Sequence, residues 1–274
     1  MLIQTNIAAL ETAKNLSRNQ AMLANSFNRL SSGFRINSAK DDAAGLAISE
    51  SMKMQIRSFV VAERNANDAI SMAQTAEGAL GELTGILGRM REIAVQGSNG
   101  SLQAVDRDYL ETEFKQLQFE VARIMSNTKF NGVMLVNRAS AAIAFQVGIN
   151  NVTADRLTVT FGGLRLTSLL SMSTTLSGAA TNAQAAIDVV DGALTRIATS
   201  RARYGAAMNR LEVTTSNLQT MRVNMSAANS RIRDVDVADE TATLSRQQVL
   251  SQGGAAILAQ ANQAPQLALA LLRG

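Results

Sequence analysis

The sequence contains no cysteine and no histidine. Without cysteine, the chain can form no disulfide, no thiolate nucleophile and no Cys-based zinc site. Without histidine, it lacks the most common general base and metal ligand, so a Ser–His–Asp triad and a HExxH zinc site are excluded. These absences argue against an enzyme, and we expect no catalytic residue, no metal and no cofactor.

Aromatic residues and proline are also scarce. The chain has no Trp, two Tyr, eight Phe and one Pro, whereas 46% of its 274 residues are hydrophobic. A core with so few rings must be built from aliphatic side chains, Met and Ala, which suits closely packed helices. Because proline interrupts helices, its scarcity permits long ones.

The chain is slightly basic, with 26 Lys and Arg against 22 Asp and Glu and a net charge of +4. So small an excess is weak evidence for nucleic-acid binding, and the interspersed acids and few aromatics argue against it. A basic coiled-coil adaptor that binds nucleic acid stays open as an alternative of a different class. No apolar run reaches the roughly 18 residues that a membrane span needs, and the start of the chain does not resemble a secretory signal peptide.

A heptad repeat dominates the first half of the sequence. Apolar residues recur every seven positions, with a second set three positions later, and predict a helix over 44–97 that ends near Gly97. The two sets are Phe59, Ala66, Ala73, Leu80, Leu87 and Ala94, and Ala62, Ala69, Ala76, Leu83 and Met90. A second helix, with apolar residues from Leu110 to Ile124, follows a short loop, so we expect an antiparallel helical hairpin.

The middle of the chain changes its period. Alternating apolar residues over 143–147 and 157–161 predict a β-hairpin near 143–162. Residues 167–182 are rich in Ser, Thr and Ala and read as an exposed loop. A third long helix is predicted over 183–229 with its own heptad repeat, in which Arg201, Thr215 and Arg222 interrupt one position of the apolar seam.

Each end of the chain predicts an amphipathic helix. A continuous apolar stripe on a helix requires a partner, so we expect the two end helices to pack together and against other subunits. Gly33 should end the first helix, Ser38 or Asp41 should cap the next, and Asp236 should cap the last one. The residues expected at a subunit interface are Leu16, Leu23, Phe27, Leu30, Leu250, Ile257, Ala261, Ala264 and Leu271.

Together these patterns predict a mainly α fold. We expect a long antiparallel, coiled-coil-like helical rod with a small β-hairpin insert and paired N- and C-terminal helices. The expected domains are a terminal helical domain with its connecting segment, residues 1–44 and 231–274, and a rod domain, residues 45–230. Such a rod with unsatisfied ends is typical of an assembly protein.

Several long motifs resemble one family. LSSGFRINSAKDDAAGLAIS at 30–49, RNANDAISMAQTAEGAL at 64–80, REIAVQGSNG at 91–100 and TKFNGV at 128–133 resemble the N-terminal signature of bacterial flagellin. Residues 230–274, beginning SRIRDVDVADE, resemble its C-terminal signature. Only a short middle separates the two arms, so the chain resembles a short form that lacks the outer surface domains.

The resemblance implies a structural subunit of the bacterial flagellar filament, a hollow helical homopolymer used for swimming. It implies secretion to the extracellular flagellum, with the type III export apparatus, a flagellin chaperone, the filament cap and hook–filament junction proteins as partners. It also implies contact with a vertebrate toll-like receptor through Arg89, Ile93 and Glu113. A hook–filament junction protein is the alternative within the same class of assembly proteins.

Overall fold

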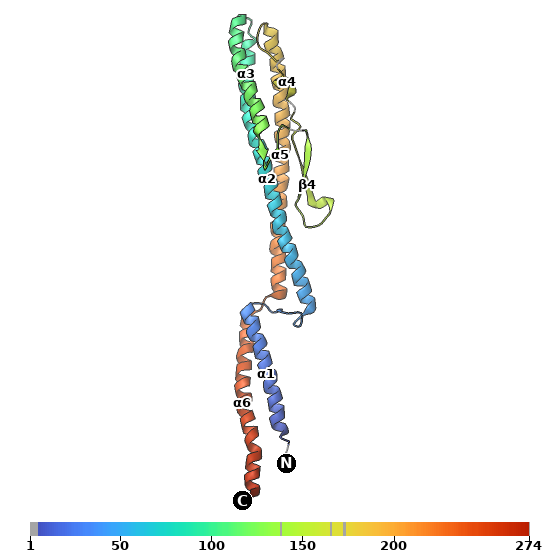
Figure 1. Cartoon of the computed structure of the whole chain (residues 1–274), viewed down its shortest axis with the longest axis vertical. Coiled ribbons are helices and arrows are strands. Elements are labelled where there is room, and N and C mark those ends of the chain that lie inside the picture. The colour runs from blue at the N-terminus through green and yellow to red at the C-terminus, as the bar shows by residue number, and fades with distance from the viewer. Residues whose placement is uncertain (1–4, 138, 165, 172–173, 274) are drawn as a thin grey trace. The chain divides into compact units, whose positions relative to one another are not determined.

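Helices make up most of the protein (Figure 1). The computed structural model describes residues 5–137, 139–164, 166–171 and 174–273, with only the backbone described at 167–168 and 264–273. The long helices are α1 (Ile7–Ser32), α2 (Ala43–Gly97), α3 (Ala104–Asn127), α5 (Ala180–Arg233) and α6 (Val237–Arg273). The prediction of a mainly α fold is therefore confirmed.

The chain divides into two compact units. Residues 1–56 and 223–274 make up one, which we call the terminal unit, and residues 57–222 make up the other, which we call the central unit. α2 and α5 cross the boundaries and contribute residues to both units.

The predicted heptad seam of α2 forms the core of the central unit. All eleven of its residues, from Phe59 to Ala94, are buried, with exposed fractions of 6% or less. The alanines in its first half have small side chains, which lets a neighbouring helix approach closely. The helix predicted over 44–97 is thus confirmed, and α2 ends at Gly97.

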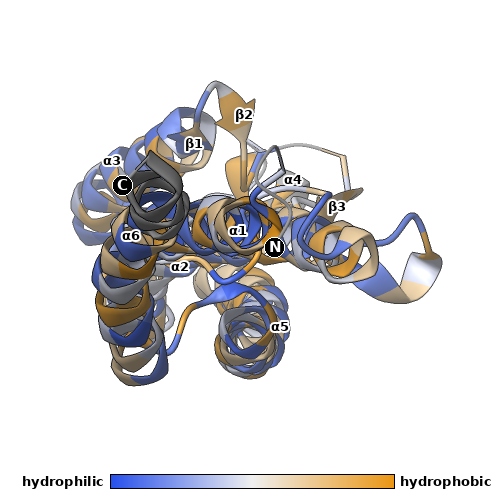
Figure 2. Ribbon diagram, turned by 90° about the horizontal axis from the view of Figure 1, so that it is seen from below, coloured by the Kyte–Doolittle hydropathy of each residue, from blue (hydrophilic) through white to orange (hydrophobic). Residues whose placement is uncertain are grey.

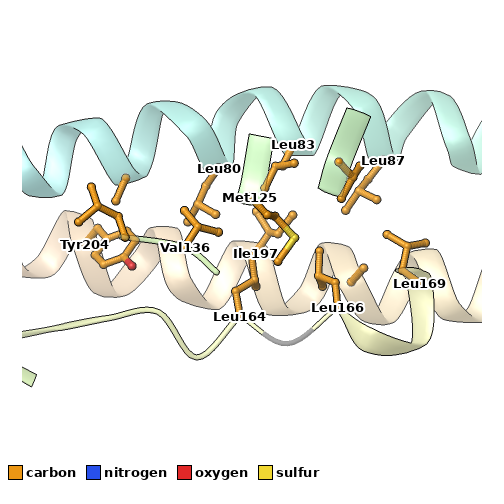
Figure 3. Close-up of a cluster of buried hydrophobic side chains, with 14 of the residues drawn as sticks. Leu80, Leu83, Leu87, Met125, Val136, Leu164, Leu166, Leu169, Ile197 and Tyr204 are labelled. Atoms are coloured by element: carbon orange, nitrogen blue, oxygen red, sulfur yellow. The ribbon is translucent and has the colours of Figure 1, made fainter. Parts of the chain in front are cut away.

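α5 lies antiparallel to α2 in this unit. Leu80, Leu83 and Leu87 of α2 lie opposite Ile197 and Tyr204 of α5 in one apolar layer (Figure 3). The two arginines that interrupt the seam of α5 pair with acidic residues of α2. The pairs are Arg201 with Glu77 at 2.7 Å and Arg222 with Glu63 at 3.8 Å.

Two strand pairs lie in the central unit. β3 (Ala141–Gln146) and β4 (Arg156–Phe161) are antiparallel, with Ile143 opposite Val159, which confirms the predicted hairpin. β1 (Lys129–Phe130) and β2 (Val133–Met134) form a second, smaller pair that the sequence analysis missed. Asn131 and Gly132 make its turn with positive φ angles of 45° and 79°, the conformation that an Asn-Gly pair favours.

The prediction of an exposed loop over 167–182 is wrong. This stretch contains the short helix α4 (Thr167–Leu170), and α5 already begins at Ala180. Leu169 and Leu176 have exposed fractions of 1% and 0% and belong to the apolar core. Their irregular spacing among Ser and Thr gives no periodic signal that would have predicted this burial.

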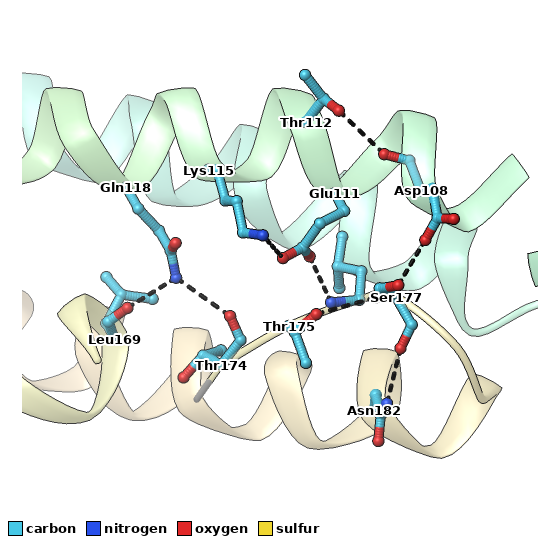
Figure 4. A network of polar contacts seen from close by, with 11 residues as sticks. Asp108, Glu111, Thr112, Lys115, Gln118, Leu169, Thr174, Thr175, Ser177 and Asn182 are labelled. Carbon is cyan, nitrogen blue, oxygen red and sulfur yellow. Dashed lines mark hydrogen bonds and ion pairs between the residues drawn. The ribbon is translucent and has the colours of Figure 1, made fainter. Parts of the chain in front are cut away.

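Polar side chains of α3 hold this buried segment in place (Figure 4). The Glu111 carboxylate accepts a hydrogen bond from the Leu176 backbone N–H at 2.6 Å and pairs with Lys115 at 2.9 Å. Two turns further along α3, the Gln118 amide donates to the Leu169 carbonyl at 2.9 Å. Because buried backbone groups need partners, these side chains replace the ladder that a strand would provide.

In the terminal unit, α1 and α6 pair as expected. Gly33 ends α1 with a positive φ of 74°, and its N–H donates to the Arg29 carbonyl. Asp236 caps α6 by accepting from the backbone N–H groups of Ala238 and Asp239, as predicted. The cap of α2 differs from the prediction, because Asp42 accepts from the Gly45 N–H while Asp41 closes the turn before it.

Among the described residues, no helix is both long and hydrophobic enough to cross a bilayer.

Candidate functional site

The paired surface of α1 and α6 is the first candidate site. The helices run antiparallel, since the Asn6 amide donates to the Ala261 carbonyl at 2.7 Å and Arg29 pairs with Glu240 at 3.7 Å. Between these ends, Leu16 lies against Gly254, where a Cβ would come within 3.4 Å of the leucine side chain. That distance is an ordinary van der Waals contact, so the two helices lie directly side by side at this point.

A buried polar layer interrupts this apolar contact. The Asn19 amide donates to the Gln247 carbonyl at 3.1 Å, and the Ser26 hydroxyl donates to the Gln247 side chain at 3.3 Å. All three residues are at most 8% exposed. The sequence analysis missed them, although Asn19 and Ser26 follow Leu16 and Leu23 by three residues and so fall on the apolar stripe. Such a layer favours one register of the pair.

Several of the expected interface residues face solvent. Phe27 is 49% exposed, and Leu250 and Ile257 are each 56% exposed. Leu23 and Leu30 are half-buried. The coloured part of α6 carries both hydrophobic and hydrophilic residues (Figure 2).

Leu250 and Ile257, but not Phe27, border a groove of about 570 Å³ between the two helices. Its lining includes Leu16, Met22, Leu250, Gly253 and Ile257. Half-buried Ala261 lies beyond it, next to Asn6. The side chains of Ala264 and Leu271 lie outside the described residues. The pair α1–α6 thus covers part of each stripe and leaves an apolar groove open.

The second candidate site lies on α2 and α3 of the central unit. The Arg89 guanidinium donates to Glu113 at 2.8 Å and to Glu92 at 3.0 Å, and all three side chains are exposed. The hydrogen bond to Glu113 is the main cause that raises the pKa of Arg89 above its ordinary value. The Arg89 guanidinium thus links two exposed carboxylates, those of Glu92 and Glu113.

Ile93 does not share this surface. Its side chain is only 1% exposed and belongs to the apolar core of the central unit. A direct contact between Ile93 and a receptor is therefore not available in this conformation, because the side chain faces inward. The sequence pattern placed it one turn from Arg89 but could not show which way the helix faces.

The two arms of the chain match known family regions. Residues 3–141 match the bacterial flagellin N-terminal helical region, and residues 187–272 match the bacterial flagellin C-terminal helical region. The chain is also 45% identical to flagellin of Halalkalibacterium halodurans, with all of both chains covered. The chain belongs to the bacterial flagellin family. Flagellins are structural proteins, and this flagellin is a subunit of the flagellar filament.

Other relatives agree with this assignment. This flagellin is 39% identical to the flagellar filament 33 kDa core protein of Treponema phagedenis, again over all of both chains. A putative flagellar hook-associated protein from Vibrio parahaemolyticus shares the fold, with a TM-score of 0.59, 71% of this chain covered and all of the other. Its identity is only 13%, so this likeness concerns the fold and does not favour a hook–filament junction protein.

Proposed function

We propose that the terminal helical domain, residues 1–44 and 231–274, forms the inner tube of the filament through the apolar groove between α1 and α6. The observation that supports this is the exposure of Phe27, Leu250 and Ile257 on a helix pair that is otherwise packed together. Copies of the chain would bury these side chains against one another. The chain then works through packing, without a catalytic group.

The physical reason is that an isolated helix pair is marginally stable in water. Most of the stability of a protein helix comes from burying its apolar face. α1 and α6 bury only part of theirs against each other, so polymerisation would complete the burial. The same contact couples ordering of the chain ends to growth of the filament.

Ile257→Asp tests this proposal. Burying Ile257 on assembly is worth roughly 1.5–3 kcal/mol, and an aspartate would add the cost of an unpaired carboxylate in an apolar contact. We expect normal melting of the monomer by circular dichroism and no sedimenting polymer after seeding. The matched control is Gln252→Asp, which adds the same charge to an exposed position of α6, roughly 140° around the helix.

Two results would contradict the inner-tube contact. Normal filaments from Ile257→Asp would show that this position faces solvent in the polymer. Equal loss of polymerisation in Gln252→Asp would show that charge on α6, rather than this apolar groove, controls growth.

We also propose that the type III export apparatus secretes this flagellin to the cell exterior, with a flagellin chaperone, the filament cap and hook–filament junction proteins as its partners. The family resemblance of both arms supports this path. A tagged chain should appear in the medium of flagellated cells and stay inside cells that lack the export apparatus. Secretion from both strains would argue against it.

We propose a toll-like receptor contact centred on Arg89 and Glu113, with Ile93 supporting α2 from the core. The exposed ion pairs of Arg89 with Glu113 and Glu92 support this surface. In a reporter assay with soluble monomer, Arg89→Ala should be less active than the parent chain, and Arg123→Ala on the exposed surface of α3 should not. Equal activity of the parent and Arg89→Ala would exclude the contact.

A further inference from the structure

The chain contains two Asn-Gly pairs, and both are exposed to water. Asn99-Gly100 lies in the loop between α2 and α3, and Asn131-Gly132 forms the turn between β1 and β2. In such a pair, the backbone nitrogen of the glycine can attack the side-chain carbonyl carbon of the asparagine. Glycine has no Cβ to hinder this approach. Sequence and exposure do not distinguish the two pairs, but their hydrogen bonds do.

The Asn99 carboxamide is folded toward the nitrogen that would attack it. Its Oδ1 atom accepts a hydrogen bond from the Ser101 backbone N–H at 3.2 Å. Since Gly100 lies between these two residues, the bond bends the side chain over the Gly100 nitrogen. The Gly100 N–H donates to no residue that the structure describes, and a Cβ at Gly100 would meet no heavy atom within 4 Å. The described part of the chain therefore neither occupies this nitrogen nor blocks its approach.

The Ser101 N–H also contacts the atom that becomes charged. As the Gly100 nitrogen adds to the side-chain carbonyl carbon of Asn99, negative charge develops on Oδ1. Hydrogen-bond donors that already point at such an oxygen lower the barrier of the reaction. The folded loop therefore favours closure of a succinimide ring between these two residues.

A second donor contacts the other carbonyl of this ring. The Arg107 guanidinium donates from Nη2 to the main-chain carbonyl oxygen of Asn99 at 3.0 Å. Arg107 is buried and also donates to the carbonyls of Gly97 and Gly178, so its position is fixed. A cation on this oxygen makes the main-chain carbonyl carbon the better target for water. Attack of water there opens the ring to isoaspartate rather than aspartate.

Asn131 lacks these contacts. Its φ of 45° and the φ of 79° at Gly132 belong to a tight turn between paired strands. The Asn131 carboxamide forms no hydrogen bond with any residue that the structure describes. Ring closure requires rotation of the backbone, which the strand pair opposes until it opens.

We propose that Asn99-Gly100 is a site of spontaneous covalent modification, which the folded loop itself promotes. In the first step, a bond forms between the Gly100 nitrogen and Cγ of Asn99, the bond from Cγ to Nδ2 breaks, and ammonia leaves with the proton of the Gly100 N–H. In the second step, water adds to the main-chain carbonyl carbon of residue 99, and the bond from that carbon to the Gly100 nitrogen breaks. The co-reactant is water, and no atom is oxidised or reduced.

The product places a new carboxylate beside Arg107. The chain now continues through Cγ of residue 99, and the former main-chain carbonyl becomes a carboxylate that releases a proton to solvent. A hydrogen bond between a guanidinium and a carboxylate is stronger than one to a neutral carbonyl, so Arg107 retains the modified loop. Each chain reacts once, and the inference does not depend on the proposed inner-tube contact.

Peptide mapping by mass spectrometry tests the proposal. The full-length chain is incubated in mildly alkaline buffer, both folded and in urea, and each pair is followed by the mass difference between an NH2 and an OH group. In the folded chain, Asn99 should react at least about fivefold faster than Asn131. In urea, the two rates should agree within about twofold, because each asparagine then precedes an unconstrained glycine.

The isomer composition tests the role of Arg107. Isoaspartate and aspartate peptides have equal masses but separate by chromatography, and an isoaspartyl methyltransferase labels only the isoaspartate form. The ratio of isoaspartate to aspartate at position 99 should be at least about twofold higher in the folded chain than in urea. An equal ratio would contradict the assignment of ring opening to Arg107.

Gly100→Ala and Ser101→Ala form a matched pair of variants. Gly100 has open space at its Cβ position and no positive φ, so alanine should not change the fold, but its methyl group hinders the attack. We expect the reaction at Asn99 to slow by at least about tenfold. Ser101→Ala removes the hydroxyl but keeps the backbone N–H and should react like the parent chain. Circular dichroism melting checks that both variants fold.

Two results would overturn the proposal. Equal rates at Asn99 and Asn131 in the folded chain would show that the loop does not promote the reaction. A faster reaction of Asn99 in urea than in the folded chain would show that the loop protects this asparagine.

Discussion

The guanidinium carbon of Arg233 lies 4.5 Å from the centroid of the Phe34 ring. The same guanidinium pairs with Glu50 at 2.6 Å, and the Arg233 carbonyl accepts a hydrogen bond from the Arg35 N–H at 2.7 Å. One residue at the end of α5 thus joins the segment after α1 to the first turns of α2. All of these contacts lie within the terminal unit.

Arg233→Lys should therefore loosen this junction. Lysine can keep an ion pair with Glu50, but its ammonium cannot stack flat on the Phe34 ring. We expect a loss of about 1 kcal/mol in the free energy of unfolding and faster amide exchange at Arg35. Hydrogen exchange read by mass spectrometry measures this, with Arg246→Lys at an exposed position of α6 as the control. Unchanged exchange would show that Phe34 is held by other contacts.

Arg107→Lys should destabilise the central unit. The Arg107 side chain is buried and donates to three carbonyls, those of Gly97, Asn99 and Gly178. Lysine cannot reach all three, and a buried carbonyl without a donor costs about 1–3 kcal/mol. Denaturant unfolding should show that Arg107→Lys lowers the free energy of unfolding by about 2–4 kcal/mol. Arg123→Lys changes only an exposed ion pair and should lower it by less than about 1 kcal/mol. Equal losses would exclude a special role for Arg107.

Alkaline pH should destabilise the central unit through Tyr204. Burial raises the pKa of Tyr204 above its ordinary value of 10.0, although a hydrogen bond with the Gly162 backbone opposes this. Since the folded state holds the phenolic proton more tightly, its stability is complete below pH 10 and falls as the pH rises above it. Above pH 10, the melting temperature of the parent chain should fall further than that of Tyr204→Phe. Tyr109→Phe, at a position that is 72% exposed, should behave like the parent.

Gly85→Ala should stabilise the monomer. A Cβ there meets open space, and alanine in a helix interior is favoured over glycine by about 0.8–1 kcal/mol. Thermal or denaturant unfolding should show most of this gain. Gly97→Ala is the contrast, because a Cβ at Gly97 would lie 3.3 Å from the Ala183 side chain, so we expect little or no gain. A loss of stability in Gly85→Ala would show that α2 bends at this glycine.

The sequence alone predicted the features that depend on local repetition. A seam from Phe59 to Ala94 can be read directly, because every seventh residue of a supercoiled helix faces the same partner. The alternation in β3 and β4 can also be read directly, because successive side chains of a strand point to opposite faces of the sheet. The Asp236 cap also follows from neighbours in the chain.

Tertiary structure decided what depends on residues far apart in the sequence. Leu176 is buried because Glu111 and the helices around it hold its segment in place, and no pattern near Leu176 records that. Ile93 faces the core although it lies only four residues from exposed Arg89, since the direction of each side chain depends on where α3 and α5 pack. The buried contact between Asn19 and Gln247 likewise joins two residues that lie 228 positions apart in the chain. Periodicity shows that a helix has an apolar face, but only packing decides which residues of that face are covered and which stay open to another copy.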